Sequence, residues 1–178
     1  MPEHEQGIGA RILAFLWGPF SRLGLTVALA TGLIDHINKW WMLTIYGIKE
    51  SDRIRVLPFL DLTYVKNLGI SYGMFSQTGP WGQRFLAAFA FAASLGLTVW
   101  LARGVTNRLL AVSLGLIIGG AVGNAIDRLV LGGVADFYSM HAFGFYWYVF
   151  NIADVAIVAG VVGLLYESFV TSREEASK

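Results

Sequence analysis

Four long apolar stretches restrict this chain to the folds that a lipid bilayer allows. They lie at about residues 23–43, 85–102, 109–131 and 152–170. A helix needs about 20 consecutive, mostly apolar residues to cross the roughly 30 Å of hydrocarbon in a membrane. The composition agrees, because 56% of the 178 residues are hydrophobic and only 14% are charged. We therefore expect an all-α membrane protein with four transmembrane helices.

Polar residues interrupt three of these stretches, and only the second is uncharged throughout. The clean part of the first stretch is too short to span a membrane, so its helix must continue through Asp35 and Lys39. The third stretch ends with Asn124, Asp127 and Arg128, and the fourth carries Asp154 in its first turn. Ionisable groups at membrane depth are costly unless they are paired, so each is a candidate functional residue.

The orientation is predicted from basic residues in the short segments that flank the helices, because these mark the cytoplasmic side. Three such segments fall on one side of a four-helix topology, and their basic residues are Arg11, Arg22, Arg103, Arg108, Arg173 and Lys178. Both termini should therefore be cytoplasmic. No small-residue cleavage motif follows the first stretch, so we interpret it as a retained anchor. We expect residues 1–178 to form a single integral membrane domain.

Two segments should then face the outside, at about residues 44–84 and 132–150. The first contains the loosely alternating run RIRVLPFLDLTYV and several Gly and Pro residues, which predicts short strands and turns on the membrane surface. The second is rich in aromatic residues, which favours a segment buried at the interface. We expect a small extracytoplasmic cradle that contains β-structure. Residues 8–20 suggest a short interfacial helix on the cytoplasmic side.

The residue types present exclude several kinds of chemistry. The chain has no Cys, which excludes thiol nucleophiles and disulfides, and three scattered His residues offer little for a metal site. The formal net charge of +1 gives no broad basic surface, so we expect no nucleic-acid partner. Any reaction must rely on carboxylates, hydroxyls, amides or Lys.

The ionisable residues at membrane depth all fall toward the same outer face. Asp35 with Lys39, Asn124 with Arg128, and Asn151 with Asp154 have helical spacings of three or four residues, so each pair shares one helical face. A structural interpretation remains open for the residues of the first and third helices. Asp127 and Arg128 could form an ion-pair network, the Asn residues could bond between helices, and Asp35 with Lys39 could reach the interface.

Asp136 and Asp154 need a different explanation, because neither has a Lys or Arg beside it in the sequence. Both lie in apolar surroundings, V-A-D-F and N-I-A-D. Two carboxyls that meet in a low-dielectric pocket cannot both ionise easily, so one stays protonated while the other can act as a general base. Such a pair can activate water against a peptide carbonyl. Spacing alone does not show that these two carboxyls meet.

The ordered motifs also resemble those of a known family, the bacterial lipoprotein signal peptidases or type II signal peptidases. The resemblance covers nearly the whole chain and is carried by five motifs. These are D-x-x-x-K from Asp35, N-L-G-I-S-Y-G at residues 67–73, G-N-A-I-D-R at 123–128, V-A-D-F at 134–137 and F-N-I-A-D at 150–154. His36 stands where the family commonly has Gln, and Tyr72 where Phe or Trp is usual.

The resemblance implies a membrane aspartic endopeptidase with Asp136 and Asp154 as its catalytic pair and with no metal or cofactor. Its substrates would be prolipoproteins, cut just before a cysteine that carries a diacylglyceryl group. Other partners would be membrane lipid and globomycin-like cyclic peptide inhibitors, and the location would be the bacterial inner membrane, with the active site toward the extracytoplasmic face. The implied substrate-binding or supporting residues are Asn67, Gly69, Asn124, Asp127, Arg128, Asn151, Asp35 and Lys39. Residues 73–81 and 143–148 would form a surface cradle and a mobile flap.

Two other classes of protein remain as alternatives. A small transporter would use Asp35, Asp127, Asp136 and Asp154 as a proton or cation relay, but it should carry acidic groups at several depths. The inner halves of the predicted helices are almost free of them. A purely structural membrane subunit would leave Asp136 and Asp154 unexplained, and replacing either should then be harmless.

Overall fold

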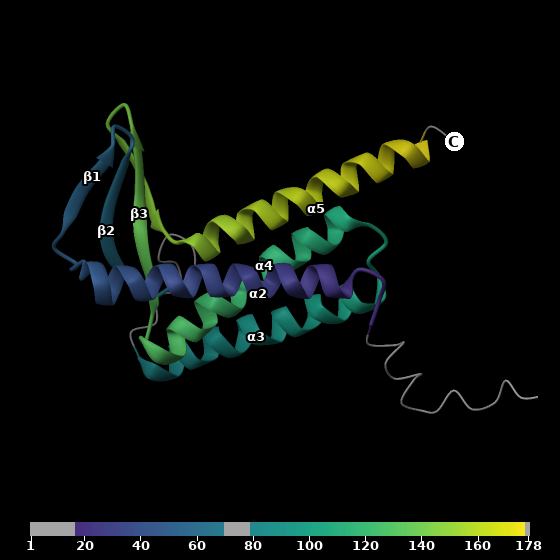
Figure 1. Ribbon diagram of the computed structural model, residues 1–178, viewed down its shortest axis with the longest axis horizontal. Helices are drawn as coiled ribbons and strands as arrows, with labels where there is room; N and C mark the ends of the chain where they lie inside the picture. Colours follow the sequence, from purple (N-terminus) through teal and green to yellow (C-terminus); the bar gives the residue numbers. More distant parts are fainter. Residues whose placement is uncertain (1–16, 70–78, 177–178) are drawn as a thin grey trace, which may run out of the picture.

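The protein combines a bundle of long helices with a small sheet at one end (Figure 1). The computed structural model describes residues 17–69 and 79–176. The helices are α2 (Ser21–Trp40), α3 (Pro80–Arg103), α4 (Arg108–Val130) and α5 (Ile152–Ala176), and α2 continues into a π-helical segment, η1 (Trp41–Tyr46). The four predicted helices are therefore present, and they extend beyond most of the predicted bounds because polar first and last turns add to the apolar runs.

Three of the described helices, α3, α4 and α5, are long and apolar enough to cross a membrane. Helix α2 does not meet the same measure of length and hydropathy, and it carries Asp35 and Lys39 on a buried face. The protein is thus mostly helical with three apolar candidate spans and a small sheet. The count of four transmembrane helices stays a prediction.

Helix α4 lies at the centre of the bundle and packs against α2, α3 and α5. Glycines permit this close packing. A Cβ atom on Gly119 would lie 2.4 Å from the backbone oxygen of Ala28 in α2, and one on Gly120 would lie 2.6 Å from the backbone oxygen of Ala153 in α5. Small residues bring membrane helices together because their backbones can touch. This packing holds α2, which carries Asp35 and Lys39, and the start of α5, which carries Asp154, against α4.

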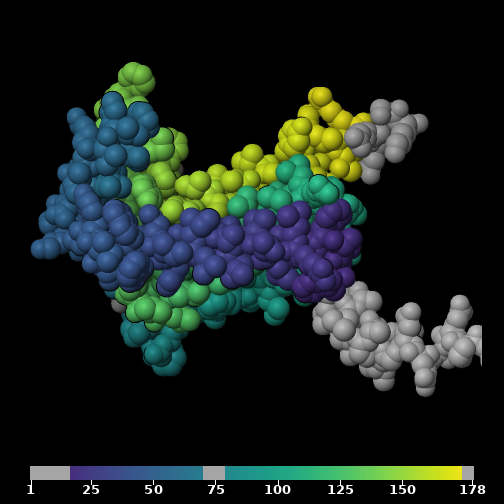
Figure 2. Space-filling view, in the orientation of Figure 1, coloured from purple at the N-terminus to yellow at the C-terminus, as the bar shows by residue number. Residues whose placement is uncertain are grey.

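The sheet contains four antiparallel strands in the order β1 (Arg53–Leu57), β2 (Leu60–Asn67), β3 (Val134–Ala142) and β4 (Phe145–Phe150). Ala135 and Phe137 of β3 are buried against Met42 and Ile48, which follow α2. Figure 2 shows the sheet standing out from one end of the bundle. Strand β3 follows α4 and β4 leads into α5, so the sheet joins the ends of both helices.

The strands expected in the first outer segment are present, as β1 and β2. The aromatic second segment forms a hairpin, β3 and β4, where the sequence suggested only burial at the interface. Phe143 and Gly144 make its turn with positive φ angles of 51° and 80°. An aromatic run can form either strands or an irregular segment buried at the interface, and here the pairing of β3 with β2 favours strands. Most of the predicted helix at residues 8–20 and most of the turn at residues 73–81 lie outside the described residues, and residues 17–20 precede α2 without being helical.

The start of α2, the turn between α3 and α4 and the end of α5 all lie at the end of the bundle away from the sheet (Figure 1). Arg22, Arg103, Arg108 and Arg173 occur in these segments. The basic segments on which the predicted orientation rests therefore gather at one end of the molecule, and the sheet occupies the other.

Candidate active site

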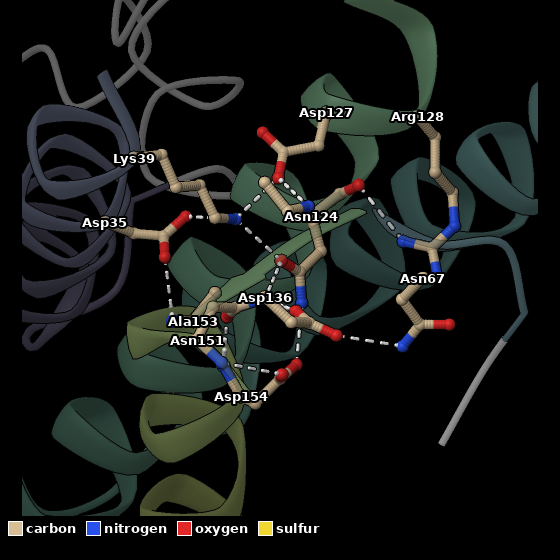
Figure 3. Close-up of polar contacts among 11 residues, drawn as sticks. Asp35, Lys39, Asn67, Asn124, Asp127, Arg128, Asp136, Asn151, Ala153 and Asp154 are labelled. Carbon is tan, nitrogen blue, oxygen red and sulfur yellow. Dashed lines mark hydrogen bonds and ion pairs between the residues drawn. The ribbon is translucent and has the colours of Figure 1, made fainter. Parts of the chain in front are cut away.

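The ten residues singled out from the sequence form one connected network where the bundle meets the sheet, and Figure 3 labels all of them except Gly69. Helices α2, α4 and α5, strands β2 and β3 and two connecting segments each contribute. Hydrogen bonds and ion pairs join Asp35, Lys39, Asn67, Gly69, Asn124, Asp127, Arg128, Asp136, Asn151 and Asp154. Sequence reasoning therefore identified a set of residues that the fold brings together.

Asn151 brings the two candidate catalytic carboxyls together. Its side-chain Nδ2 donates to Oδ1 of Asp136 at 2.6 Å, and its backbone N–H donates to Oδ2 of Asp154 at 3.2 Å. Asp136 lies in β3 and Asp154 in the first turn of α5, and Asn151 directly precedes that helix. The meeting of the carboxyls, which spacing could not establish, thus depends on the junction between β4 and α5.

The same junction forms a capping box at the start of α5. The Oδ1 atom of Asn151 accepts the backbone N–H of Asp154 at 2.9 Å, while Asp154 accepts the N–H of Asn151 in return. Reciprocal bonds of this kind satisfy backbone donors that a helix start otherwise leaves unpaired. Asp154 is therefore held in one orientation by the local structure of the helix.

Two further amides complete the donors around the carboxyls. Asn67 Nδ2 donates to Oδ2 of Asp136 at 3.1 Å, and Asn124 Nδ2 donates to Oδ1 of Asp154 at 2.9 Å. All four carboxyl oxygens of Asp136 and Asp154 thus accept an N–H group. Because amides donate without adding charge, they orient the two carboxyls without supplying a counter-ion.

Asp136 lies in the sheet and is almost completely buried, with 1% of its surface exposed. Burial is the main cause that raises its pKa from 3.8 to about 7, and the negative charge of Asp154 raises it further. Hydrogen bonds from Asn67 and Asn151 oppose the shift, because they favour the ionised carboxylate. Asp136 can therefore hold a proton at neutral pH.

A buried ion triad lies behind the two carboxyls. The Nζ atom of Lys39 is 2.7 Å from Oδ2 of Asp35 and 2.7 Å from Oδ2 of Asp127, and it donates to Oδ1 of Asn124 at 3.0 Å. Lys39, Asp35 and Asp127 are each at most 2% exposed. The sequence left open that Asp35 and Lys39 reach the interface as a surface pair. The structure places them inside the network instead.

The triad also holds two backbone groups that the sequence analysis missed. Asp35 accepts the N–H of Ala153 at 3.0 Å, and Asp127 accepts the N–H of Ala135 at 3.2 Å. These alanines directly precede Asp154 and Asp136. Both motifs, V-A-D-F and F-N-I-A-D, place an Ala directly before the Asp, and this shared A-D dipeptide was the only sequence signal for these donors. It could not be interpreted, because a backbone N–H group donates whatever the side chain is.

Arg128 connects α4 to the segment after β2. Its guanidinium donates to the backbone oxygen of Asn124 at 3.0 Å and to that of Gly69 at 2.8 Å. The N–H of Gly69 in turn donates to Oδ1 of Asn67 at 3.0 Å, which turns the Asn67 amide toward Asp136. Arg128 therefore acts on the carboxyls through Asn67.

A polar cavity of about 120 Å³ adjoins Asp154, and its walls also include Asn67, Asn124, Arg128 and Tyr148. A cavity of this size with several polar groups can hold water. Tyr148 of β4 was not singled out individually from the sequence, because it is one of many aromatic residues in its segment. The arrangement supplies a buried acid, a base and space for water, which is what general acid–base hydrolysis requires.

Comparison with known proteins gives a consistent result. The sequence model of the family "Signal peptidase (SPase) II" matches residues 27–170. The chain is 48% identical over 153 residues to a lipoprotein signal peptidase of Rhodopseudomonas palustris, covering 84% of this chain and 93% of the relative. It is 50% identical over 147 residues to one of Methylorubrum extorquens, covering 83% and 85% of the two chains.

Solved structures agree with these sequence matches. One bacterial membrane enzyme superposes with a TM-score of 0.77 at 26% identity, covering 88% of this chain and 93% of that one. A second has a TM-score of 0.70 at 27% identity, covering 82% and 91%. The match of the family model to most of the chain, with the extent of identity to these relatives, shows that the protein belongs to the signal peptidase II family.

Proposed function

We propose that the protein is a membrane aspartic endopeptidase that removes signal peptides from prolipoproteins and uses Asp136 and Asp154 as its catalytic pair. Membership of the signal peptidase II family makes it a peptidase of lipoprotein processing, and hence a hydrolase. The observation that carries the aspartic mechanism is the bridge through Asn151, which bonds to the buried carboxyl of Asp136 and to the partly buried carboxyl of Asp154.

The proposed reaction begins with Asp136 protonated and Asp154 ionised. Asp154 removes a proton from water as the water oxygen attacks the scissile carbonyl carbon, and Asp136 donates its proton to the carbonyl oxygen. The tetrahedral intermediate then returns that proton to Asp136 as its C–O bond regains double-bond character. The C–N bond breaks, and the leaving amine takes the proton held by Asp154. This sequence restores both carboxyls to their starting states.

The proposed cleavage point is the bond before a cysteine that carries a diacylglyceryl group. Lipid of this kind stays in the bilayer, so its enzyme must hold the reacting bond at the membrane boundary. The carboxyls lie at the sheet end of long apolar helices, which supports this placement. We also propose that globomycin-like cyclic peptides inhibit the enzyme by occupying the polar cavity in place of the substrate backbone.

We propose further that residues 1–178 form one integral domain of the bacterial inner membrane with four transmembrane helices. Both termini would be cytoplasmic and the active site would face the extracytoplasmic side. The gathering of Arg22, Arg103, Arg108 and Arg173 at the end of the bundle away from the sheet supports this orientation.

The test is cleavage of a diacylglyceryl-modified prolipoprotein peptide by the purified protein in detergent. Asp136→Asn and Asp154→Asn should each lower kcat by about 10² to 10⁴-fold at equal folded amounts, because each removes a proton-transfer group. Asp61→Asn is the control matched to Asp136, since Asp61 in β2 is as buried as Asp136 but pairs with His141. Full activity in either site variant would rule out the proposed pair.

A further inference from the structure

Helix α3 carries a buried amide close to the end of the bundle where the sheet lies. Gln83 lies near the start of α3 and is 3% exposed, although most residues of this helix are not buried. Only one other polar residue of α3, Ser94, is buried. An amide buried in a membrane helix is costly unless it is hydrogen-bonded. The bond that Gln83 makes therefore indicates why a polar residue occupies this position.

The Gln83 amide bonds to the segment that follows β2. Its Nε2 donates to the backbone oxygen of Leu68 at 2.7 Å. The carbonyl of Leu68 and the N–H of Gly69 belong to the same peptide group, which is planar. That N–H donates to Oδ1 of Asn67 at 3.0 Å. Gln83 and Asn67 are thus bonded to opposite ends of one rigid unit.

The chain of hydrogen bonds continues to the carboxyl in β3. Asn67 Nδ2 donates to Oδ2 of Asp136 at 3.1 Å, and Figure 3 shows the Asn67 amide pointing toward that carboxyl. Hydrogen bonds in a chain polarise one another, so a carbonyl that accepts a bond makes the N–H of its own peptide group a better donor. If this peptide group rotated, its N–H would leave Asn67. The direction of the Asn67 amide thus depends on the orientation of the peptide group.

We propose that Gln83 is a positioning residue for cleavage, which fixes this peptide group from α3 and so keeps Asn67 directed at Asp136. The inference rests on the proposed function, because it assigns Asp136 a proton-transfer role. Arg128 acts in the same way from α4, where its guanidinium donates to the next carbonyl, that of Gly69, at 2.8 Å. Two helices therefore hold consecutive carbonyls of one segment. Among the described residues, those that line the polar cavity at Asp154 do not include Gln83, so its action on the reaction is indirect.

The experiment measures cleavage of the diacylglyceryl-modified prolipoprotein peptide by the full-length protein in detergent. Gln83→Met keeps the length of the side chain and removes its N–H donor. We expect kcat to fall by about two- to tenfold, the factor that corresponds to one net hydrogen bond, with KM unchanged. Gln83→His keeps an N–H donor at a similar reach and should recover most of the lost kcat.

The pH profile of kcat/KM separates this role from a purely structural one. The bond from Asn67 favours the ionised form of Asp136, so a loosened Asn67 should move the alkaline limb of the profile to higher pH. Four other charged or titratable groups act on this carboxyl, and they are Asp154, Lys39, Arg128 and Tyr64. Gln83→Met changes none of these groups, so a shifted limb reports on Asn67.

Two further variants complete the design. Ser94→Ala is the matched control, because Ser94 is the other buried polar residue of α3, and it should leave kcat, KM and the alkaline limb unchanged. The double variant Gln83→Met with Asn67→Ala tests the chain of hydrogen bonds itself. Because the action of Gln83 passes through Asn67, Gln83→Met should add no further change to Asn67→Ala. Thermal denaturation in the same detergent confirms that equal folded amounts are compared.

Three results would overturn the assignment. A wild-type kcat and pH profile in Gln83→Met would show that the peptide group keeps its orientation without the amide. A full additional loss in the Asn67→Ala background would show that Gln83 acts elsewhere, for example by holding α3 against the bundle. A raised KM with unchanged kcat would place Gln83 in contact with the substrate.

The outcome stays decisive if Gln83→Met does not fold. Gln83→Asn withdraws the amide from Leu68 by one methylene group and carries the same expectations. A wild-type protein that cleaves no peptide would refute the proposed function, and with it the role of Gln83. A wild type that needs Asp136 but is insensitive to both Gln83 substitutions would refute the positioning role alone.

Discussion

At the scale of single residues, Asn67 and Asn151 oppose the rise in the pKa of Asp136 that burial causes. Both donate a hydrogen bond to its carboxyl and so favour the ionised form, whereas burial and the charge of Asp154 favour the neutral form. The balance leaves the pKa of Asp136 at about 7. Because the two carboxyls interact, a measured pKa will belong to the pair.

The pH dependence of cleavage follows from this balance. If Asp136 must be protonated, kcat/KM should fall about tenfold per pH unit above an apparent pKa of about 7. Asn67→Ala removes a donor that stabilises the ionised carboxylate, so it should move the alkaline limb to higher pH. Profiles of kcat/KM from about pH 5 to 9 would show the shift.

The control for this profile is Asn38→Ala. The Asn38 amide donates to the hydroxyl of Tyr138 at 2.8 Å and contacts neither carboxyl, so its removal should leave the alkaline limb in place. A limb that moves downward in Asn67→Ala, or by the same amount in both variants, would contradict the assigned role of Asn67.

At the scale of secondary-structure elements, the contact between α2 and α4 depends on glycine. Gly119→Ala would place a Cβ atom 2.4 Å from a backbone oxygen of α2, and neither backbone can move without shifting a helix. We expect the free energy of unfolding to fall by about 1–3 kcal/mol, as in overpacked cores. Thermal denaturation in detergent measures the change.

Gly96→Ala is the matched substitution on α3, where an added Cβ would meet nothing within 4 Å. It should leave stability unchanged or raise it slightly, because Ala has the higher helix propensity. Equal destabilisation by both substitutions would show that the effect comes from losing glycine itself and not from the contact between α2 and α4.

At the scale of the whole molecule, the ion triad connects the elements that carry the two carboxyls. Lys39 of α2 pairs with Asp35 and with Asp127 of α4, and these carboxylates accept the N–H groups of Ala153 in α5 and Ala135 in β3. The position of Asp136 relative to Asp154 therefore depends on contacts between four elements. No pair of them alone fixes it.

Lys39→Met tests this connection because it leaves Asp35 and Asp127 buried without their shared cation. Breaking a buried ion pair costs about 3–5 kcal/mol, so the variant should be strongly destabilised and its kcat should fall at equal folded amounts. Asp35→Asn should be milder, because Lys39 keeps Asp127 and the Asn oxygen can still accept the N–H of Ala153.

The double variant Asp35→Asn with Lys39→Met completes a double-mutant cycle measured by thermal denaturation and by kcat. Its loss of stability should be smaller than the sum of the two single losses, since only one buried carboxylate is then left without a cation. Additive losses, or a Lys39→Met protein as stable as the wild type, would argue against the triad as the link between the elements.

The helices and part of the polar network were predictable from local sequence patterns, whereas Asn67 and Gly69 were implied only by the resemblance to a known family. Apolar runs of about 20 residues indicate membrane helices wherever they occur, and an ionisable residue within such a run must find a partner or a function. Asp35, Lys39 and Asp127 were therefore candidates for a common site before any fold was known, with a purely structural role left open for them.

What local patterns could not decide is how separate elements meet. The pairing of the aromatic segment as β3 and β4 depends on β2, which lies far away in the sequence. The contact of Asp136 with Asp154 through Asn151, and the use of Ala135 and Ala153 as backbone donors, depend on packing between helices and sheet. Long-range contacts of this kind leave no periodicity in the chain, so only the tertiary structure determines them.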